Sequence, residues 1–133
     1  MNILLIEDDA IETMKIHRVV AQLPASYNIT EAKNGEEALN ILNSGEICPD
    51  IILLDLNMPL MNGIEFLKIL KNHPTIKYLP TIVLTTSENR ADLLKCYSLG
   101  IAGYVVKPLN YSEYQSRITK LLNYWDVNEL VKA

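Results

Sequence analysis

Cysteine, glycine-rich loops and long hydrophobic runs are scarce in this chain, and each shortage excludes a class of protein. Its 133 residues include two cysteines, Cys48 and Cys96, without metal-type spacing, so we expect free thiols rather than a disulfide or a metal site. No hydrophobic run approaches the roughly 20 residues that span a bilayer. The start of the chain also lacks the cationic segment of a signal peptide. We therefore expect a cytoplasmic protein without membrane association.

Positive charge is also scarce, and it is scattered along the chain. There are 12 Lys and Arg residues against 16 Asp and Glu residues, for a formal net charge of -4. A broad nucleic-acid-binding face needs clustered Lys and Arg to contact phosphates, so we expect no nucleic-acid partner. No glycine-rich loop follows the first apolar run, which disfavours a nucleotide-binding fold.

What the sequence does contain is a regular alternation of short apolar runs and amphipathic stretches. Strands are predicted at five of these runs: Asn2–Ile6, Tyr27–Ala32, Ile51–Leu54, Thr81–Leu84 and Tyr104–Val106. Helices are predicted at about 10–23, 35–42, 64–71, 90–99 and 112–124. Short connections between them imply right-handed crossovers and a mostly parallel sheet with helices on both faces. We expect one α/β domain over residues 1–133, with a short extension of the last helix at about 125–133.

One carboxylate, Asp55, follows an apolar run that is typical of a strand buried on both faces. The turn residues Met58-Pro59 and Asn62-Gly63 come next and force the chain out of extended structure. Ligands bind at the carboxyl ends of the strands in open α/β sheets. Asp55 therefore marks a candidate site.

Polar residues end three other predicted strands in the same way. These groups are Glu7-Asp8-Asp9, Thr85-Thr86-Ser87 and Lys107-Pro108. Clustered carboxylates repel one another and need a cation, and Mg²⁺ suits Asp8 or Asp9 together with Asp55 because it prefers oxygen ligands. The Lys107 ammonium and the Thr85 hydroxyl can each bind a phosphoryl oxygen. The residues thus predict a Mg²⁺ site beside a receptor for a phosphoryl group on Asp55.

Two simpler interpretations stay open at this point. The acidic run also fits the N-cap of the first helix, because an Asp there accepts hydrogen bonds from free backbone amides. Tyr104 also fits a fixed aromatic residue of the core. Neither interpretation requires a functional site.

Taken in order, these four motifs resemble the receiver domain of the two-component response regulators, over nearly the whole chain. The resemblance implies a flavodoxin-like fold with a five-stranded parallel sheet of strand order 2-1-3-4-5. It implies that Asp55 accepts a phosphoryl group from a sensor histidine kinase or a phosphotransfer protein. It also implies no enzymatic activity beyond the protein's own phosphotransfer and autodephosphorylation.

The resemblance also implies roles for the surrounding residues. Asp8 or Asp9 and the Asn57 carbonyl would bind Mg²⁺ with the acceptor carboxylate, and Thr85 and Lys107 would bind the phosphoryl group. Thr85 would then move inward and let the family's switch residue, Tyr104, fill the space behind it. The face of the fourth helix, fifth strand and fifth helix would change shape and signal to a downstream protein.

Details of the sequence refine this expectation. Residues 70–80 and the C-terminal tail are similar to those of stand-alone receivers that work with phytochrome-type kinases. Thr86 stands where many receivers have Ala or Gly, which predicts narrower access to the phosphoryl pocket. The last predicted helix carries more aromatic residues than packing on a sheet needs, so we expect an interface there and a homodimer.

Two other functions fit the sequence less well. A receiver-like docking module that works without phosphorylation is the main alternative, but it has no need for the complete set of acidic, hydroxyl and lysine residues. An aspartyl-phosphate phosphatase of the haloacid dehalogenase class needs a second acid two residues after its nucleophile. The chain has Asn57 at that position.

Overall fold

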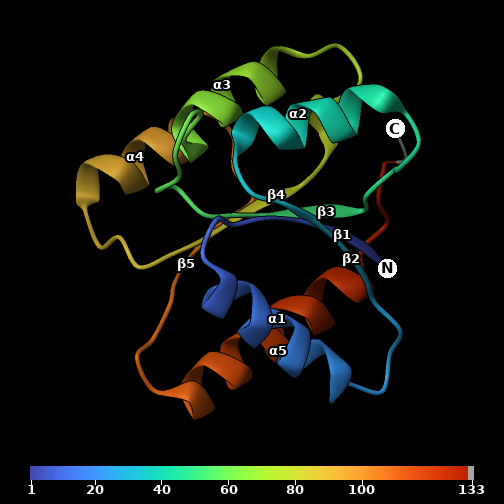
Figure 1. The fold of residues 1–133 in the computed structure, drawn as a ribbon, viewed down its shortest axis with the longest axis vertical. Coiled ribbons are helices and arrows are strands. Elements are labelled where there is room, and N and C mark those ends of the chain that lie inside the picture. The colour runs from blue at the N-terminus through green and yellow to red at the C-terminus, as the bar shows by residue number, and fades with distance from the viewer. Residues whose placement is uncertain (132–133) are drawn as a thin grey trace.

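The structure is a computed structural model that describes residues 1–131 as a parallel sheet of five strands between two layers of helices (Figure 1). The strand order is β2-β1-β3-β4-β5, and every neighbouring pair is parallel. This confirms the predicted fold class and the predicted strand order.

The elements begin and end within a few residues of their predicted limits. The strands are β1 (Asn2–Ile6), β2 (Asn28–Ala32), β3 (Ile51–Leu54), β4 (Thr81–Thr85) and β5 (Gly103–Val106). The helices are α1 (Ala10–Ala21), α2 (Gly35–Ser44), α3 (Gly63–Asn72), α4 (Arg90–Ser98) and α5 (Tyr111–Asp126). A short 3-10 helix, η1 (Ile76–Tyr78), was not predicted. Strand β4 is one residue longer than predicted, so Thr85 lies inside it.

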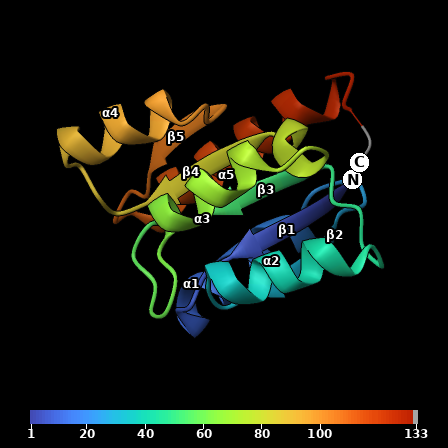
Figure 2. The same ribbon diagram turned by 90° about the horizontal axis from the view of Figure 1, so that it is seen from above.

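Side-chain alternation in the central strands builds two hydrophobic cores, one on each face of the sheet. In β1, Leu4 and Ile6 join the core under α2, α3 and α4, whereas Ile3 and Leu5 join the core under α1 and α5. Figure 2 shows α2, α3 and α4 lying over the strands, with α1 and α5 on the other face. Because helices cover both faces of the central strands, the carboxyl ends of these strands are where polar side chains can meet a ligand.

Helix α5 ends at Asp126, so the expected extension of this helix is wrong for residues 127–131, which are not helical. Residues 125–126 of the predicted extension belong to this helix, and residues 132–133 lie outside the described residues. None of the helices described between residues 1 and 131 has both the length and the apolar composition to cross a membrane.

Candidate functional site

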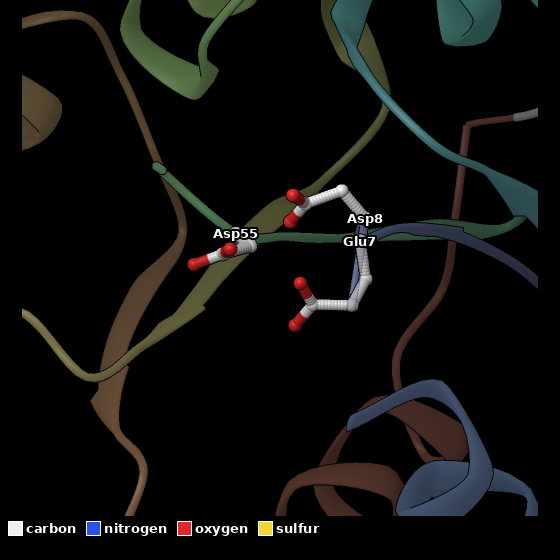
Figure 3. A group of neighbouring side chains, drawn as sticks. All are labelled: Glu7, Asp8 and Asp55. Carbon is white, nitrogen blue, oxygen red and sulfur yellow. The ribbon is translucent and has the colours of Figure 1, made fainter. Parts of the chain in front are cut away.

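Three carboxylates meet at the carboxyl end of the sheet. Glu7 and Asp8 follow β1 and Asp55 follows β3, and each offers an oxygen within 4.8 Å of the others (Figure 3). Glu7 is buried, Asp8 is exposed and Asp55 is half-buried. Carboxylate oxygens on one edge are the donors that Mg²⁺ and Mn²⁺ prefer, so these residues fit a divalent cation.

The backbone holds Asp55 firmly in this group. Its amide donates to the Ile6 carbonyl at 3.0 Å, which extends the ladder between β1 and β3, and its Oδ1 accepts from the Leu56 amide at 2.9 Å. The first residue of α3, Gly63, packs against the same backbone. A Cβ on Gly63 would lie 2.6 Å from the Asp55 carbonyl oxygen and 2.8 Å from the Leu56 Cα. Glycine at this position therefore lets α3 begin directly against the candidate acceptor.

Lys107 forms a buried ion pair with the innermost carboxylate. Its Nζ donates to Glu7 Oε1 at 2.6 Å and lies 3.4 Å from Glu12 Oε2, with only 6% of the lysine side chain exposed. The strand alternation explains the first contact. The backbone hydrogen bonding of the sheet continues for one residue past three of the strands, through the amides of Glu7, Asp55 and Lys107. Side chains alternate along a strand, so these three residues point to the same face as α1 and α5.

The charges in this cluster shift one another's protonation. Burial raises the pKa of Glu7 to about 7, although the hydrogen bond and charge of Lys107 act in the opposite direction. Burial by itself lowers the pKa of Lys107, but the hydrogen bond and charge of Glu7, with the charges of Asp55 and Glu12, outweigh it and raise the pKa. Lys107 therefore keeps its positive charge beside Asp55 at neutral pH.

The predicted hydroxyl and switch residues meet at one loop. Thr85 is fully buried, and its Oγ1 accepts from the Ser87 amide at 3.2 Å. The half-buried Tyr104 donates its hydroxyl proton to the Ser87 carbonyl at 3.0 Å. Ser87 thus connects the two residues, while Thr86 lines the acidic cleft.

The acidic cleft has a volume of about 420 Å³ and is lined by residues that follow β1, β3, β4 and β5. Its lining residues are Glu7, Asp8, Asp9, Glu12, Asp55, Asn57, Thr86 and Lys107. A phosphoryl group needs a negatively charged acceptor, a nearby cation and room for its oxygens. The cleft offers all three around Asp55.

Asp9 has a different position from its acidic neighbours. Its Oδ1 accepts from the amides of Ile11 at 2.8 Å and Glu12 at 3.2 Å, so Asp9 is the N-cap of α1. Among residues 1–131, the cluster of acidic residues close enough to share a metal ion includes Asp8 but not Asp9. The capping interpretation that the sequence left open describes Asp9.

Two acidic residues of the site were not singled out from the sequence. Glu7 belongs to the acidic run after β1, and side-chain alternation along this strand places it on the same side as Ile3 and Leu5, which is a usable signal. Glu12 gave no such signal. It lies in the first turn of α1 and reaches Lys107 because α1 and α5 pack on the same face of the sheet, the face toward which Lys107 points.

Comparison with known proteins agrees with this geometry. Residues 3–119 match the family model described as the response regulator receiver domain. The probable methanogenesis regulatory protein FilR2 of Methanothrix harundinacea is 32% identical over 127 residues, which cover 92% of this chain and 82% of that protein. Response regulator Rcp1 of Synechocystis is 30% identical over 128 residues, which cover 92% of this chain and 87% of Rcp1.

Solved structures are similar over nearly the full length. The phosphorylated cyanobacterial phytochrome response regulator RcpA has a TM-score of 0.92 at 30% identity, covering 97% of this chain and 96% of RcpA. The Mn²⁺-bound form of Rcp1 has a TM-score of 0.91 at 28% identity and covers 98% of both chains. From its family match, its sheet order and the residues at its strand ends, we conclude that the chain belongs to the receiver domains of the two-component response regulators.

Proposed function

We propose that this protein is a receiver whose signalling state is set by phosphorylation of Asp55. A carboxylate oxygen of Asp55 attacks the phosphorus of a phosphohistidine, so that a P–O bond forms and the P–N bond breaks. The donor is a sensor histidine kinase or a phosphotransfer protein, and the departing imidazole nitrogen takes up a proton. The observation that carries this proposal is the half-buried Asp55 carboxylate in a cleft that also holds the charged Lys107. The similar protein RcpA was crystallised in a phosphorylated form.

We further propose that Asp8, Asp55 and the Asn57 carbonyl hold Mg²⁺, with Glu7 completing the negative charge around it. A bound Mg²⁺ ion supplies positive charge that neutralises phosphoryl oxygens. Lys107 supplies a second positive charge, which its ion pair with Glu7 holds in place. The similar protein Rcp1 was solved in a Mn²⁺-bound form, which supports the binding of a divalent ion.

The experiment that tests the proposal is incubation with acetyl phosphate and Mg²⁺, followed by intact mass spectrometry. A single, transient phosphoryl adduct is expected, since an acyl phosphate hydrolyses slowly. Absence of an adduct would favour the docking module that works without phosphorylation. Many turnovers of unrelated phosphate esters would instead indicate an enzyme.

Separate substitutions of Asp8 and Asp9 distinguish a metal ligand from a helix cap. We expect Asp8→Asn to weaken Mg²⁺-dependent labelling by more than about tenfold, because it removes a charged ligand. Asp9→Asn is the matched control and keeps labelling, since Asn caps a helix as well as Asp does. The effect of each substitution is measured as the change in the Mg²⁺ concentration that gives half-maximal labelling. Equal shifts in the two variants would contradict the assignment of Asp8.

We propose that Ser87 transmits phosphorylation to the signalling face. A phosphoryl group on Asp55 attracts the Thr85 hydroxyl, which accepts from the Ser87 amide in the unphosphorylated protein. Movement of Ser87 then changes its hydrogen bond with the Tyr104 hydroxyl. Tyr104 lies on β5 next to α4 and α5, so we propose this face as the surface that a downstream partner reads.

We also propose that the protein forms a homodimer through its α5 end. The edge strand β5 and α5 border an open apolar groove of about 610 Å³, lined by Tyr104, Val105, Leu121, Tyr124 and Trp125 among others. Tyr124 is 60% exposed although it contacts Trp125 edge to face. In a dimer with two-fold symmetry the same patch of both copies forms the interface, so a second copy would cover these aromatic rings with its own.

Light scattering with and without a phosphoryl analogue tests the dimer. We expect the wild-type chain to have the mass of a dimer in at least one of the two states, and Tyr124→Glu to have the mass of a monomer in both. Tyr78→Glu is the matched control, since Tyr78 is similarly exposed on η1, away from the groove. A monomeric wild type in both states would contradict the proposal.

A further inference from the structure

Two buried polar atoms next to Lys107 lack a hydrogen-bond partner among the described residues. They are Oε2 of Glu12 and the hydroxyl oxygen of Tyr114. Both side chains line one narrow space together with Glu7, Asp55 and Lys107, and this space leaves no room for water. An unpaired buried polar group costs free energy, so two of them beside the candidate site need an explanation.

Glu12 places a second carboxylate beside Lys107, in addition to Glu7. Its Oε2 lies 3.4 Å from Lys107 Nζ, and its Oε1 accepts from Lys15 at 3.3 Å. The contact with Lys107 is an ion pair without a hydrogen bond. If Lys107 turns toward a phosphoryl group on Asp55, Oε2 of Glu12 loses this charge partner inside the protein.

Tyr114 is the other donor that lines this space. It is a fully buried residue of α5, and burial followed by the negative charge of Glu12 raises the pKa of its hydroxyl. The hydroxyl therefore keeps its proton and can donate to a carboxylate. Since no water fits between these groups, a hydrogen bond from Tyr114 is the available replacement for Lys107.

We propose that Glu12 and Tyr114 are positioning residues that set how readily Lys107 passes from the carboxylates to a phosphoryl group on Asp55. Glu12 holds Lys107 in the unphosphorylated protein, and Tyr114 donates to Glu12 once Lys107 has left. This inference rests on the proposed phosphorylation of Asp55. Neither residue touches the phosphoryl group, so both act through Lys107.

A double-mutant cycle on the full chain tests this pair. The rate of phosphorylation by acetyl phosphate is measured by intact mass at fixed Mg²⁺ for wild type, Glu12→Gln, Tyr114→Phe and the double variant. We expect Glu12→Gln to accelerate labelling about fivefold, because it releases Lys107, and Tyr114→Phe to slow labelling about fivefold. In the Glu12→Gln background, Tyr114→Phe is expected to change the rate by less than about twofold.

Tyr111→Phe is the matched control. The Tyr111 hydroxyl is also buried without a hydrogen-bond partner among residues 1–131, its ring stacks on Tyr114 at 6.2 Å, and it does not line the space beside Lys107. We expect its labelling rate to equal that of the wild type. A general loss of packing in α5 would slow both tyrosine variants equally, whereas the proposed role slows only Tyr114→Phe.

The outcomes separate this inference from the function on which it rests. Equal rates for Tyr114→Phe and Tyr111→Phe overturn the inference, even if Glu12→Gln fails to fold. Strictly additive effects of the Glu12 and Tyr114 substitutions also overturn the inference. Additive effects would mean that Glu12 acts only through its charge at the cleft and that Tyr114 acts independently of Glu12. A wild-type chain that takes no label overturns the proposed function itself.

Discussion

Replacing Asp55 with Asn is expected to abolish phosphoryl acceptance by this protein. An amide oxygen is too weak a nucleophile to attack phosphorus, whereas the carboxylate is the group on which the proposed acyl phosphate forms. The measurement is intact mass after incubation with acetyl phosphate and Mg²⁺, or acid-labile radiolabel from a phosphorylated kinase. The variant should show no adduct under conditions that label the wild type.

The Asp55→Asn variant should fold like the wild type, so a loss of labelling would report the loss of the acceptor and not of the fold. The amide side chain introduced at position 55 keeps an oxygen that can accept from the Leu56 amide, as Asp55 Oδ1 does at 2.9 Å. Removing one of three neighbouring carboxylates also relieves repulsion with Glu7 and Asp8, so the free energy of unfolding should rise by about 1 kcal/mol. Asp9→Asn removes a nearby charge outside the cluster and should still be labelled. An acid-labile adduct on the Asp55 variant would place the acceptor at another residue.

Replacing Lys107 with Met is expected to lower the free energy of unfolding by about 3 kcal/mol. The substitution leaves Glu7 and Glu12 without the buried positive charge that now lies 2.6 Å and 3.4 Å from their oxygens. Removing one partner of a buried ion pair is costly because the remaining charge stays desolvated. Urea denaturation measures the loss.

Mg²⁺ and a surface lysine provide controls for this prediction. Added Mg²⁺ should restore part of the lost stability, because a cation in the cleft again neutralises the carboxylates. Lys68→Met removes an exposed lysine from α3, away from the cleft and the groove, and should change the free energy of unfolding by less than about 0.5 kcal/mol. Equal stability of the two lysine variants would mean that the ion pair with Glu7 contributes nothing.

Most of the fold follows from local patterns in the chain. Ile51–Leu54 is apolar at every position and forms a strand buried on both faces, as such runs do in a parallel sheet. The ends of helices are less predictable from sequence, because they depend on which backbone amides and carbonyls find hydrogen-bond partners in the folded chain. Helix α1 ends at Ala21, before Pro24, because the Gln22 amide donates to the Val19 carbonyl and the Leu23 amide to the Val20 carbonyl, which tightens the last turn.

The candidate site was predicted only in part. The position of Asp55 at a strand end follows from an apolar run and the turn residues after it, so local sequence suffices. The choice between Asp8 and Asp9 requires the direction of each side chain at the start of α1, where Asp9 turns to cap the helix. Adjacent acidic residues in a sequence do not reveal which of them faces a neighbouring strand.

The sequence by itself determined the parallel α/β fold, the family resemblance and Asp55 as the candidate acceptor, because each depends on residues that are close together along the chain. Only the tertiary structure decided which carboxylates surround Lys107. Glu7 and Lys107 are 100 residues apart in the sequence, and Glu12 reaches the same ammonium from a helix. Contacts of this kind depend on strand order and helix packing together, which no local pattern encodes.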